Sequence, residues 1–241
     1  MGNSSRDEIL KRIRNGLRHK AEASEATIPA GEKLARETVK RETLRRHEEL
    51  KGRKQAVVNR FVEEITNIRG ISKVIPSEGE IKEFIGGLIK GRGVRCVAMW
   101  ESDFLRRINL KGFLQSEGLQ FASPESGGEM ANADIGITEA DFAVAETGTI
   151  VLMTNKKQPR SVSLIPPIHI AVVNSEVIVE NIHDLFLILE NSLPGSGSIL
   201  DLTNCMTFIT GPSRTADIEL TLTLGVHGPR EVFVLVYSQS P

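Results

Sequence analysis

The chain has 241 residues, enough for one large α/β domain or for a domain with an extension. Its 30 Lys and Arg nearly balance its 31 Asp and Glu, and aromatic residues make up 5%, which argues against a nucleic-acid platform or a membrane surface. It has two cysteines, Cys96 and Cys205, whereas an iron–sulfur cluster normally takes four thiolates, so we expect no cluster held by this chain.

The first 69 residues are predicted to form a helical extension. Apolar spacing and polar composition predict a helix over about 4–17, a small-residue linker over 20–31 and a long charged helix over 32–68, whose second half covers the core. Residues 1–60 hold 16 Lys and Arg against 9 Asp and Glu, which leaves two interpretations open, solvated basic helices or a basic arm that docks an acidic partner. No apolar run has the length of a signal peptide or a transmembrane helix, so we expect no membrane insertion.

Residues 70–241 are predicted to form an α/β domain. Short apolar runs alternate with helical stretches, and the run "VRCVAMW" is typical of a strand buried on both faces. Strand–helix alternation predicts a mostly parallel sheet with helices on its faces. The expected strands are 71–77, 94–100 and 119–124, and the expected helices are 78–93, ended by Gly91 or Gly93, and 103–118.

The middle of the chain has a different pattern. "FAVAE" and "TIVLMT" are separated by Thr147-Gly148, which predicts an antiparallel hairpin inserted into the α/β order. Beyond it we expect strands over 166–179, 205–211 and 230–238, and a helix over 181–193.

The first candidate site is "ITGPSRTADIE". Gly211 permits a tight turn, and Ser213 or Thr215 is predicted to cap a following helix whose free N–H groups, with Arg214, would attract an anion. The spacing fits neither a P-loop nor a dinucleotide-binding fingerprint, and Asp217 near the helix start opposes phosphate. A ligand site and a capped strand-to-helix turn both stay open.

The second candidate is "LGVHGPRE". Gly225 is predicted to end that helix, and His227 lies in a glycine-rich turn before Gly228-Pro229. A histidine with access to solvent at the edge of a sheet could move a proton, but a lone histidine more often hydrogen-bonds its own turn.

The third candidate is the tip of the predicted hairpin. Glu146 follows an apolar run, and a carboxylate there could act as a base or a nucleophile. Arg160, in a loop, could clamp a carboxylate. No zinc site is predicted, because His169, His183 and His227 lack local ligand spacing. A triad of Ser213, His227 and Asp217 has no nucleophile elbow to support it.

These motifs together resemble a known family. "GITEADFAVAETGTIVL", "PPIHIAVV" and "ITGPSRTADIELTLTLGVHGPREVFVLV" closely resemble, in this order, the LUD domain of the lactate-utilisation protein C family. The resemblance covers about residues 70–237. It implies an α/β three-layer sandwich with a mostly parallel sheet, like the ribose-5-phosphate isomerase and CoA-transferase superfamily, behind an N-terminal helical extension.

The resemblance also implies a function. It implies a cytoplasmic subunit of a complex that oxidises L-lactate to pyruvate, with an iron–sulfur, LUD-containing partner and a cysteine-rich oxidoreductase-like partner. The iron–sulfur clusters would then lie in the partners, and no cofactor or metal is expected on this chain. Glu146-Thr147-Gly148 is similar in form to the "ENG"-type sequence of CoA transferases, with Thr in place of Asn.

Three hypotheses follow: a lactate-oxidation subunit that binds a small carboxylate or phosphorylated ligand, a stand-alone isomerase or acyl/CoA transferase that uses Glu146, and a non-catalytic scaffold. The predicted ligand cleft lies at the carboxyl ends of the sheet strands. Its candidate catalytic residues are Glu146 and His227, and its candidate ligand-binding residues are Thr147, Gly148, Arg160, Gly211, Ser213, Arg214, Thr215, Asp217 and Gly228.

Overall fold

A computed structural model describes residues 53–124, 126–155, 157–191, 205–215 and 223–238. These all belong to the second of two compact units, 1–42 and 43–241. The helices predicted over 4–17 and over 32–52, and the linker between them, lie outside the described residues, as does Asp217.

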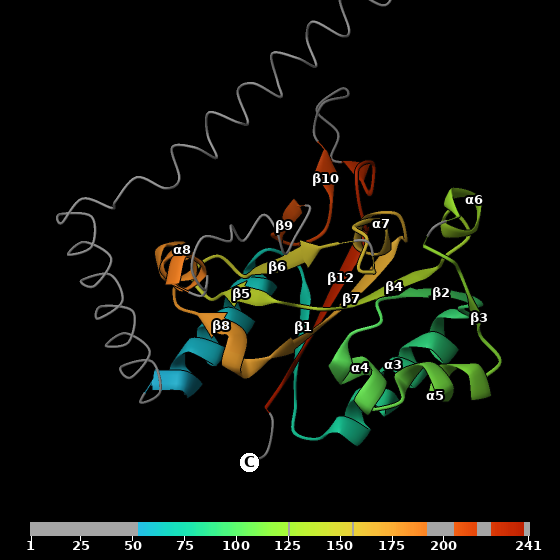
Figure 1. Cartoon of the computed structure of the whole chain (residues 1–241), viewed down its shortest axis with the longest axis horizontal. Helices are drawn as coiled ribbons and strands as arrows, with labels where there is room; N and C mark the ends of the chain where they lie inside the picture. Colours follow the sequence, from blue (N-terminus) through green and yellow to red (C-terminus); the bar gives the residue numbers. More distant parts are fainter. Residues whose placement is uncertain (1–52, 125, 156, 192–204, 216–222, 239–241) are drawn as a thin grey trace, which may run out of the picture. The chain divides into compact units, whose positions relative to one another are not determined.

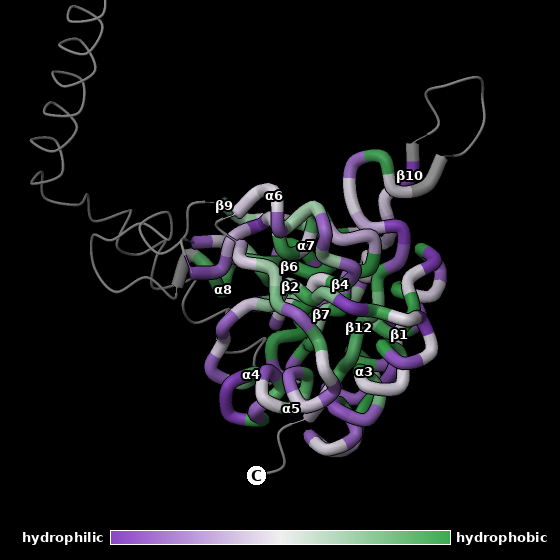
Figure 2. Tube along the Cα trace, turned by 90° about the vertical axis from the view of Figure 1, so that its right-hand side faces the viewer, coloured by the Kyte–Doolittle hydropathy of each residue, from purple (hydrophilic) through white to green (hydrophobic). Residues whose placement is uncertain are grey.

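The centre of the fold is a six-stranded parallel sheet of order β1-β12-β7-β4-β2-β3 (Figure 1). Its hydrophobic strands lie at the centre of the described body (Figure 2), because helices or a second sheet cover both faces. The predicted α/β class with a mostly parallel sheet is therefore confirmed. The strands are β1 (Ile71–Ile75), β2 (Cys96–Met99), β3 (Gln120–Phe121), β4 (Ile135–Glu139), β7 (Ile168–Asn174) and β12 (Glu231–Tyr237).

Three helices cover one face of this sheet. The helix α3 (Glu78–Arg92) begins where Ser77 accepts the N–H of Glu80. It ends at Gly93 in the left-handed region, the second of the two glycines predicted as its end. The single helix predicted over 103–118 is wrong in one respect, because Asn109 at φ 47° divides it into α4 (Asp103–Arg107) and α5 (Leu110–Ser116). Apolar side chains of α3, α4 and α5 pack on those of the sheet in one buried cluster.

A smaller sheet of order β8-β5-β6-β9 lies on the other side of the fold (Figure 1). The hairpin predicted around Thr147-Gly148 is confirmed, because β5 pairs antiparallel with β6. The predicted strand over 205–211 also exists, but it pairs with β6 in this smaller sheet. The strands are β5 (Phe142–Val144), β6 (Thr149–Thr154), β8 (Ile178–Val179) and β9 (Cys205–Ile209), and η2 (Ser175–Val177) joins β7 to β8.

The space between the two sheets is closed by a helix over residues 53–67. Phe61 and Ile65 of this helix are fully buried in a cluster that includes apolar residues of both sheets. The expectation that the end of the long N-terminal helix covers the core is thus met by its described part. On the outer face of the small sheet, Leu185 and Leu189 of α8 (Ile182–Asn191) pack on β5, β6 and β8.

The helix predicted after Gly211 is wrong at its described ends. The chain forms β10 (Arg214–Thr215), which pairs antiparallel with β11 (Thr223–Leu224). Ser213 therefore precedes a strand and Gly225 follows one, whereas residues 216–222 lie outside the described ranges. The physical reason lies in "TLTL", residues 221–224, where β-branched threonines alternate with leucines at the period of a strand. Two short helices complete the described fold, α6 (Gly127–Met130) and α7 (Ser161–Leu164).

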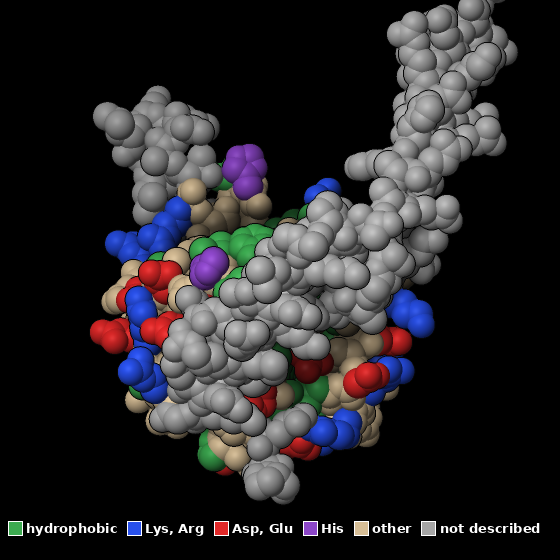
Figure 3. Space-filling view, turned by 60° about the vertical axis from the view of Figure 1, so that its left-hand side comes forward, with side chains coloured by type: hydrophobic (Ala, Val, Ile, Leu, Met, Phe, Trp, Pro, Cys, Tyr) green, Lys and Arg blue, Asp and Glu red, His purple; other side chains and the backbone are tan. Residues whose placement is uncertain are grey.

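On the face in Figure 3, acidic and basic side chains of the described residues lie interspersed, without a patch of one sign. Within the described ranges, no helix combines the length and apolar character needed to cross a bilayer. The same part of the chain holds no group of three or more His, Cys, Asp or Glu residues arranged to bind a metal ion.

Candidate functional site

The topology of the main sheet marks one place for a ligand. After β2 the chain moves to β3 at one edge, whereas after β4 it moves through β7 and β12 toward the other edge. The loops after β2 and β4 therefore diverge, and a crevice opens between the carboxyl ends of these two strands. Open parallel sheets bind ligands at such a switch point.

A cavity of about 580 Å³ lies at this crevice, and we call it the carboxyl-edge cavity. Its walls come from Glu101–Phe104 after β2, Arg107 on α4, Glu139–Asp141 at the end of β4, Val177, and Asn155, Lys157 and Gln158 after β6. Its volume is in the range of small-molecule sites.

A second hollow of about 490 Å³ adjoins it, and we call it the lysine hollow. Lys111, Phe121, Ser123 and Pro159 line it, and Glu101 and Lys157 belong to the walls of both cavities. Lys111 lies over the ring of Phe121 at 5.7 Å and forms an ion pair of 3.1 Å with Glu101. The two cavities together extend along the carboxyl ends of β4, β2 and β3.

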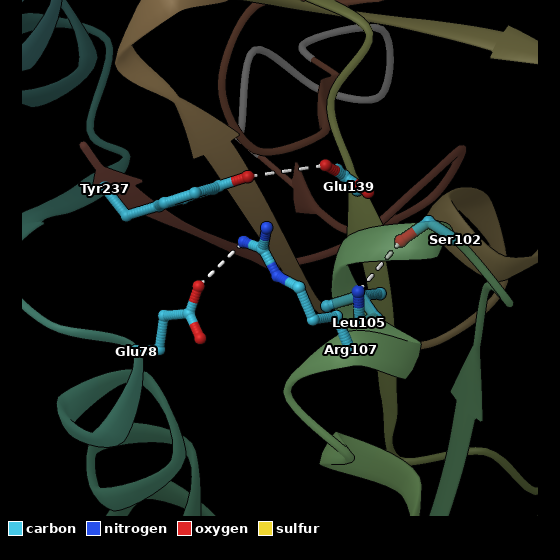
Figure 4. Close-up of polar contacts among 6 residues, drawn as sticks. All are labelled: Glu78, Ser102, Leu105, Arg107, Glu139 and Tyr237. Atoms are coloured by element: carbon cyan, nitrogen blue, oxygen red, sulfur yellow. Dashed lines mark hydrogen bonds and ion pairs between the residues drawn. The ribbon is translucent and has the colours of Figure 1, made fainter. Parts of the chain in front are cut away.

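Half of the six charged wall residues of the carboxyl-edge cavity are paired within the protein. Arg107 donates to Glu78 at 2.7 Å (Figure 4). Arg107 also lies 5.2 Å from the Phe104 ring, and Asp103 pairs with Arg106. Within the described ranges, Glu139, Asp141 and Lys157 line the cavity without an ion-pair partner. These three are thus the charged groups most available to a ligand.

Asp141 sits where the chain leaves the main sheet for the small one. Its backbone N–H bonds Val151 O at 3.1 Å, and its Oδ2 accepts the N–H of Met153 at 2.6 Å. Burial raises the pKa of Asp141 to about 6, the bond from Met153 opposes this shift, and nearby Glu139 adds to it. A carboxyl group with such a pKa can hold or release a proton near neutral pH.

Tyr237, at the end of β12, contacts two wall residues of the carboxyl-edge cavity. Its ring stacks on Phe104, with the centroids 4.0 Å apart, and its hydroxyl donates to Glu139 Oε1 at 3.5 Å (Figure 4). Burial is the main cause that raises the pKa of Tyr237 above its ordinary value, with Glu139 as a second cause. The phenol therefore stays neutral at neutral pH and serves as a hydrogen-bond donor.

The sequence-predicted residues of the hairpin tip lie elsewhere. Glu146 is exposed, and its N–H bonds Glu180 O at 2.9 Å. Thr147 bonds Thr149 at 2.7 Å, and Thr149 bonds Thr210 at 2.8 Å, so three hydroxyl groups form a chain beside Gly148. None of these residues lines either cavity.

Three of the predicted residues meet at the end of the helix over 53–67. A Cβ at Gly148 would lie 2.8 Å from the backbone of Glu64 and Ile65, and one at Gly211 would lie 2.8 Å from Ile68 O. The guanidinium of Arg214 donates to the same Ile68 oxygen. Glycine allows the backbones to approach here, and arginine binds a carbonyl just past the end of the helix.

Ser213, His227 and Gly228 form a separate turn. Ser213 N–H bonds Pro229 O at 2.8 Å, and the backbone N–H of His227 bonds Ser213 Oγ at 3.3 Å. Arg230 N–H then bonds Pro167 O at 2.8 Å, just before β7 and β12 begin. The turn therefore lies at the amino ends of these strands, so its predicted place at their carboxyl ends is wrong.

Arg160 is exposed at the start of α7, where its carbonyl accepts the hydroxyl of Ser163 at 3.0 Å. Thr215 is in β10, and Asp217 lies outside the described residues. The structure does not bring the predicted residues together into one pocket, and their part in ligand binding stays a prediction.

Sequence reasoning missed Glu139, Asp141, Lys157 and Tyr237. A signal for two of them was present, because "ITEAD" places two acids two residues apart at the end of an apolar strand, where a parallel sheet binds ligands. The predicted site residues came instead from the glycine-bearing turns. No local sequence pattern marks Lys157 or Tyr237, because only the packing of distant segments brings them to the cavity.

Comparisons with known proteins add the family context. A family model described as "LUD domain" matches residues 58–237. "Lactate utilization protein C" of Halalkalibacterium halodurans is 33% identical over 185 residues, which cover 75% of this chain and 79% of that protein. The protein of the same description from Anoxybacillus flavithermus is 30% identical over 165 residues, which cover 66% of this chain and 71% of that protein.

One similar solved structure is that of a DUF162 family protein from Deinococcus radiodurans. It has a TM-score of 0.53 and 21% sequence identity, and the match covers 76% of this chain and 98% of that chain. At this identity the likeness concerns the fold alone.

Proposed function

Since this chain belongs to the LUD domain family, we propose that it acts in lactate utilisation, as a subunit of a complex that oxidises L-lactate. The observation that carries the proposal is the match over residues 58–237, joined to relatives described as lactate utilisation protein C. The match includes all strands of the main sheet and both cavities at its carboxyl edge.

In this proposal the redox centres belong to partner subunits. The two cysteines of the chain are fewer than the four thiolates of an ordinary iron–sulfur cluster, and Cys96 and Cys205 lie on strands of different sheets. Burial raises the pKa of the Cys96 thiol, which disfavours the thiolate that binds iron. An iron–sulfur, LUD-containing subunit and a cysteine-rich subunit are the proposed partners.

The contribution of this chain is to bind a small carboxylate at the carboxyl edge of the sheet. Lys157, exposed and without an ion-pair partner within the described ranges, is the proposed contact for the carboxylate. Lys157 borders both cavities, whereas Lys111 in the lysine hollow is paired with Glu101. Ser102, Asn155 and Gln158 offer uncharged polar groups for a hydroxyl or a keto oxygen.

The role in lactate utilisation is tested by growth. A strain that lacks this gene and its paralogues should fail to grow on L-lactate, and the wild-type gene should restore growth. The affinity-tagged chain should copurify with partners that show the visible absorption of iron–sulfur clusters. Unimpaired growth of the deletion strain on lactate would overturn the proposal.

The site is tested by complementation with matched variants. Lys157→Met should restore growth poorly, because it removes the proposed contact for the carboxylate. Lys73→Met is the control, since Lys73 is also exposed but lies on edge strand β1, outside both cavities. Equal growth of the two variants would remove Lys157 from the site.

A further inference from the structure

The carboxyl-edge cavity carries an excess of negative charge that an anionic ligand must overcome. Among the described wall residues, the internal ion pairs leave two acids, Glu139 and Asp141, and one cation, Lys157, without an ion-pair partner. A carboxylate that binds Lys157 would bring a third negative charge to the site. Like charges in a partly buried site disfavour one another, and the ordinary relief is that one carboxylate takes up a proton.

We propose that the carboxyl-edge cavity binds its organic anion together with one proton, which the Asp141 carboxyl group carries. This inference rests on the proposed function, since it assumes that the ligand is a small carboxylate. It adds that the chain is a proton-coupled binder, in which the protonated Asp141 donates a hydrogen bond to the bound anion.

Geometry selects Asp141 rather than Glu139 as the proton carrier. Asp141 Oδ2 accepts the N–H of Met153 at 2.6 Å, so the proton belongs on the other carboxyl oxygen, Oδ1. Glu139 Oε1 instead accepts the hydroxyl of Tyr237 at 3.5 Å. Burial also raises the pKa of Asp141 to about 6, so protonation near neutral pH is within reach.

The other charged groups around the cavity do not reproduce this behaviour. Glu101 is paired with Lys111, Asp103 with Arg106 and Arg107 with Glu78. Tyr237, whose pKa is raised by burial, keeps its proton at neutral pH. His169 is fully buried away from the cavity walls, and burial lowers its pKa to about 4. The ligand carboxylate ionises near pH 4 and stays charged above pH 5.5.

The test is to measure the affinity of the full-length chain for L-lactate and for pyruvate between pH 5.5 and 8.5. The single tryptophan is a suitable reporter, because Trp100 Nε1 donates to Pro159 O at 3.0 Å and Pro159 lines the lysine hollow. If only the protonated form binds, the apparent affinity should fall about fivefold between pH 6 and 7 and about ninefold between pH 7 and 8. Calorimetry in buffers of different ionisation enthalpy should show uptake of about one proton at pH 8.

The matched variants are Asp141→Asn and Asp103→Asn. Asp141→Asn keeps an oxygen for the N–H of Met153 and should bind with an affinity that does not change with pH. Asp103→Asn changes an exposed wall residue in the same way and should keep the wild-type slope. The proton count on the wild-type chain needs no variant, so the test stands even if Asp141→Asn fails to fold.

Three results would overturn the inference: binding without a pH dependence, an unchanged slope in Asp141→Asn, or no binding of either acid at any pH. None of these bears on the growth test, which alone decides the role in lactate utilisation. If the deletion strain grows normally while the purified chain still binds the acid together with a proton, the inference about the cavity stands. The proposed role in lactate utilisation is then refuted.

Discussion

Replacing Gly148 with alanine tests whether the glycine of the hairpin tip exists to let the helix over 53–67 approach. Gly148 has φ 61°, and an added Cβ would lie 2.8 Å from Glu64 C and Ile65 N, against 3.4 Å for an ordinary contact. The neighbouring backbone would have to move by about 0.6 Å. Such overpacking costs about 1–3 kcal/mol, and the left-handed conformation costs a further 1–2 kcal/mol or so.

Two other glycines separate these contributions. Gly93 has nearly the same φ, 63°, but nothing lies within 4 Å of its added Cβ, so Gly93→Ala measures the backbone strain alone. Gly87, inside α3, has neither the strain nor a neighbour, so Gly87→Ala should stabilise the fold by about 0.8–1 kcal/mol. An alanine also restricts the unfolded chain, which offsets about 0.4–1 kcal/mol of the loss in Gly93→Ala and in Gly148→Ala.

Urea unfolding followed by far-ultraviolet circular dichroism gives the free energy of unfolding of each variant. We expect Gly93→Ala to lose about 1 kcal/mol and Gly148→Ala about 2–4 kcal/mol. Equal losses in the two variants would refute the reasoning, because the close approach to the helix would then contribute nothing.

Three further perturbations follow from the described contacts. Arg214→Ala should lower the free energy of unfolding by about 1 kcal/mol in urea titrations, because it removes the bond to Ile68 O, whereas Arg160→Ala should change it by less than about 0.5 kcal/mol. Burial lowers the pKa of His169 to about 4, so its contribution to wild-type stability is present above pH 6.5 and is lost as the pH falls toward 4. His169→Gln should lack this loss of roughly 3 kcal/mol in unfolding free energy. An equal loss in the wild type and the variant would contradict the assignment to His169. The raised pKa of Asp141, about 6, has the opposite sign, since its contribution to stability is present below pH 4 and lost as the pH rises through 6. Relative to wild type, Asp141→Asn should therefore gain about 2 kcal/mol in unfolding free energy from pH 4 to 7, and a constant difference would contradict the assignment.

The sequence predicts those parts of the fold that local patterns determine. Ser77 and Gly93 mark the two ends of α3 as a cap and a left-handed residue do elsewhere, and Thr147-Gly148 marks the hairpin. Local patterns do not predict the sheet to which a strand belongs. The segment 205–211 is apolar enough for the parallel sheet, yet β9 pairs with β6, because the partner of a strand is set by packing between distant segments.

The candidate site was less accessible to sequence reasoning, for a physical reason. Asp141 owes its raised pKa to burial, and its carboxyl is held by Met153 of the next strand. Tyr237 reaches Glu139 across 98 positions of sequence. Burial and long-range contacts of this kind leave no periodicity or turn signal, whereas glycine-rich turns are visible in the sequence whatever their purpose.

The most recognisable motifs of the chain and its charged cavity therefore lie in different parts of the fold. Gly148, Gly211 and Arg214 all contact residues 64–68, at the end of the helix that closes the core between the two sheets. We expect these residues to support function through stability. Gly148→Ala should thus restore growth on lactate at low temperature and fail at high temperature, in step with its lowered melting temperature.

Lys157→Met should behave in the opposite way, with a growth defect at every temperature and an unchanged melting temperature, because an exposed side chain without an ion-pair partner within the described ranges contributes little to folding. If Gly148→Ala instead abolished growth at all temperatures while the chain stayed folded, the hairpin tip would have a direct part in the chemistry. The carboxyl-edge cavity would then be only one part of the functional site.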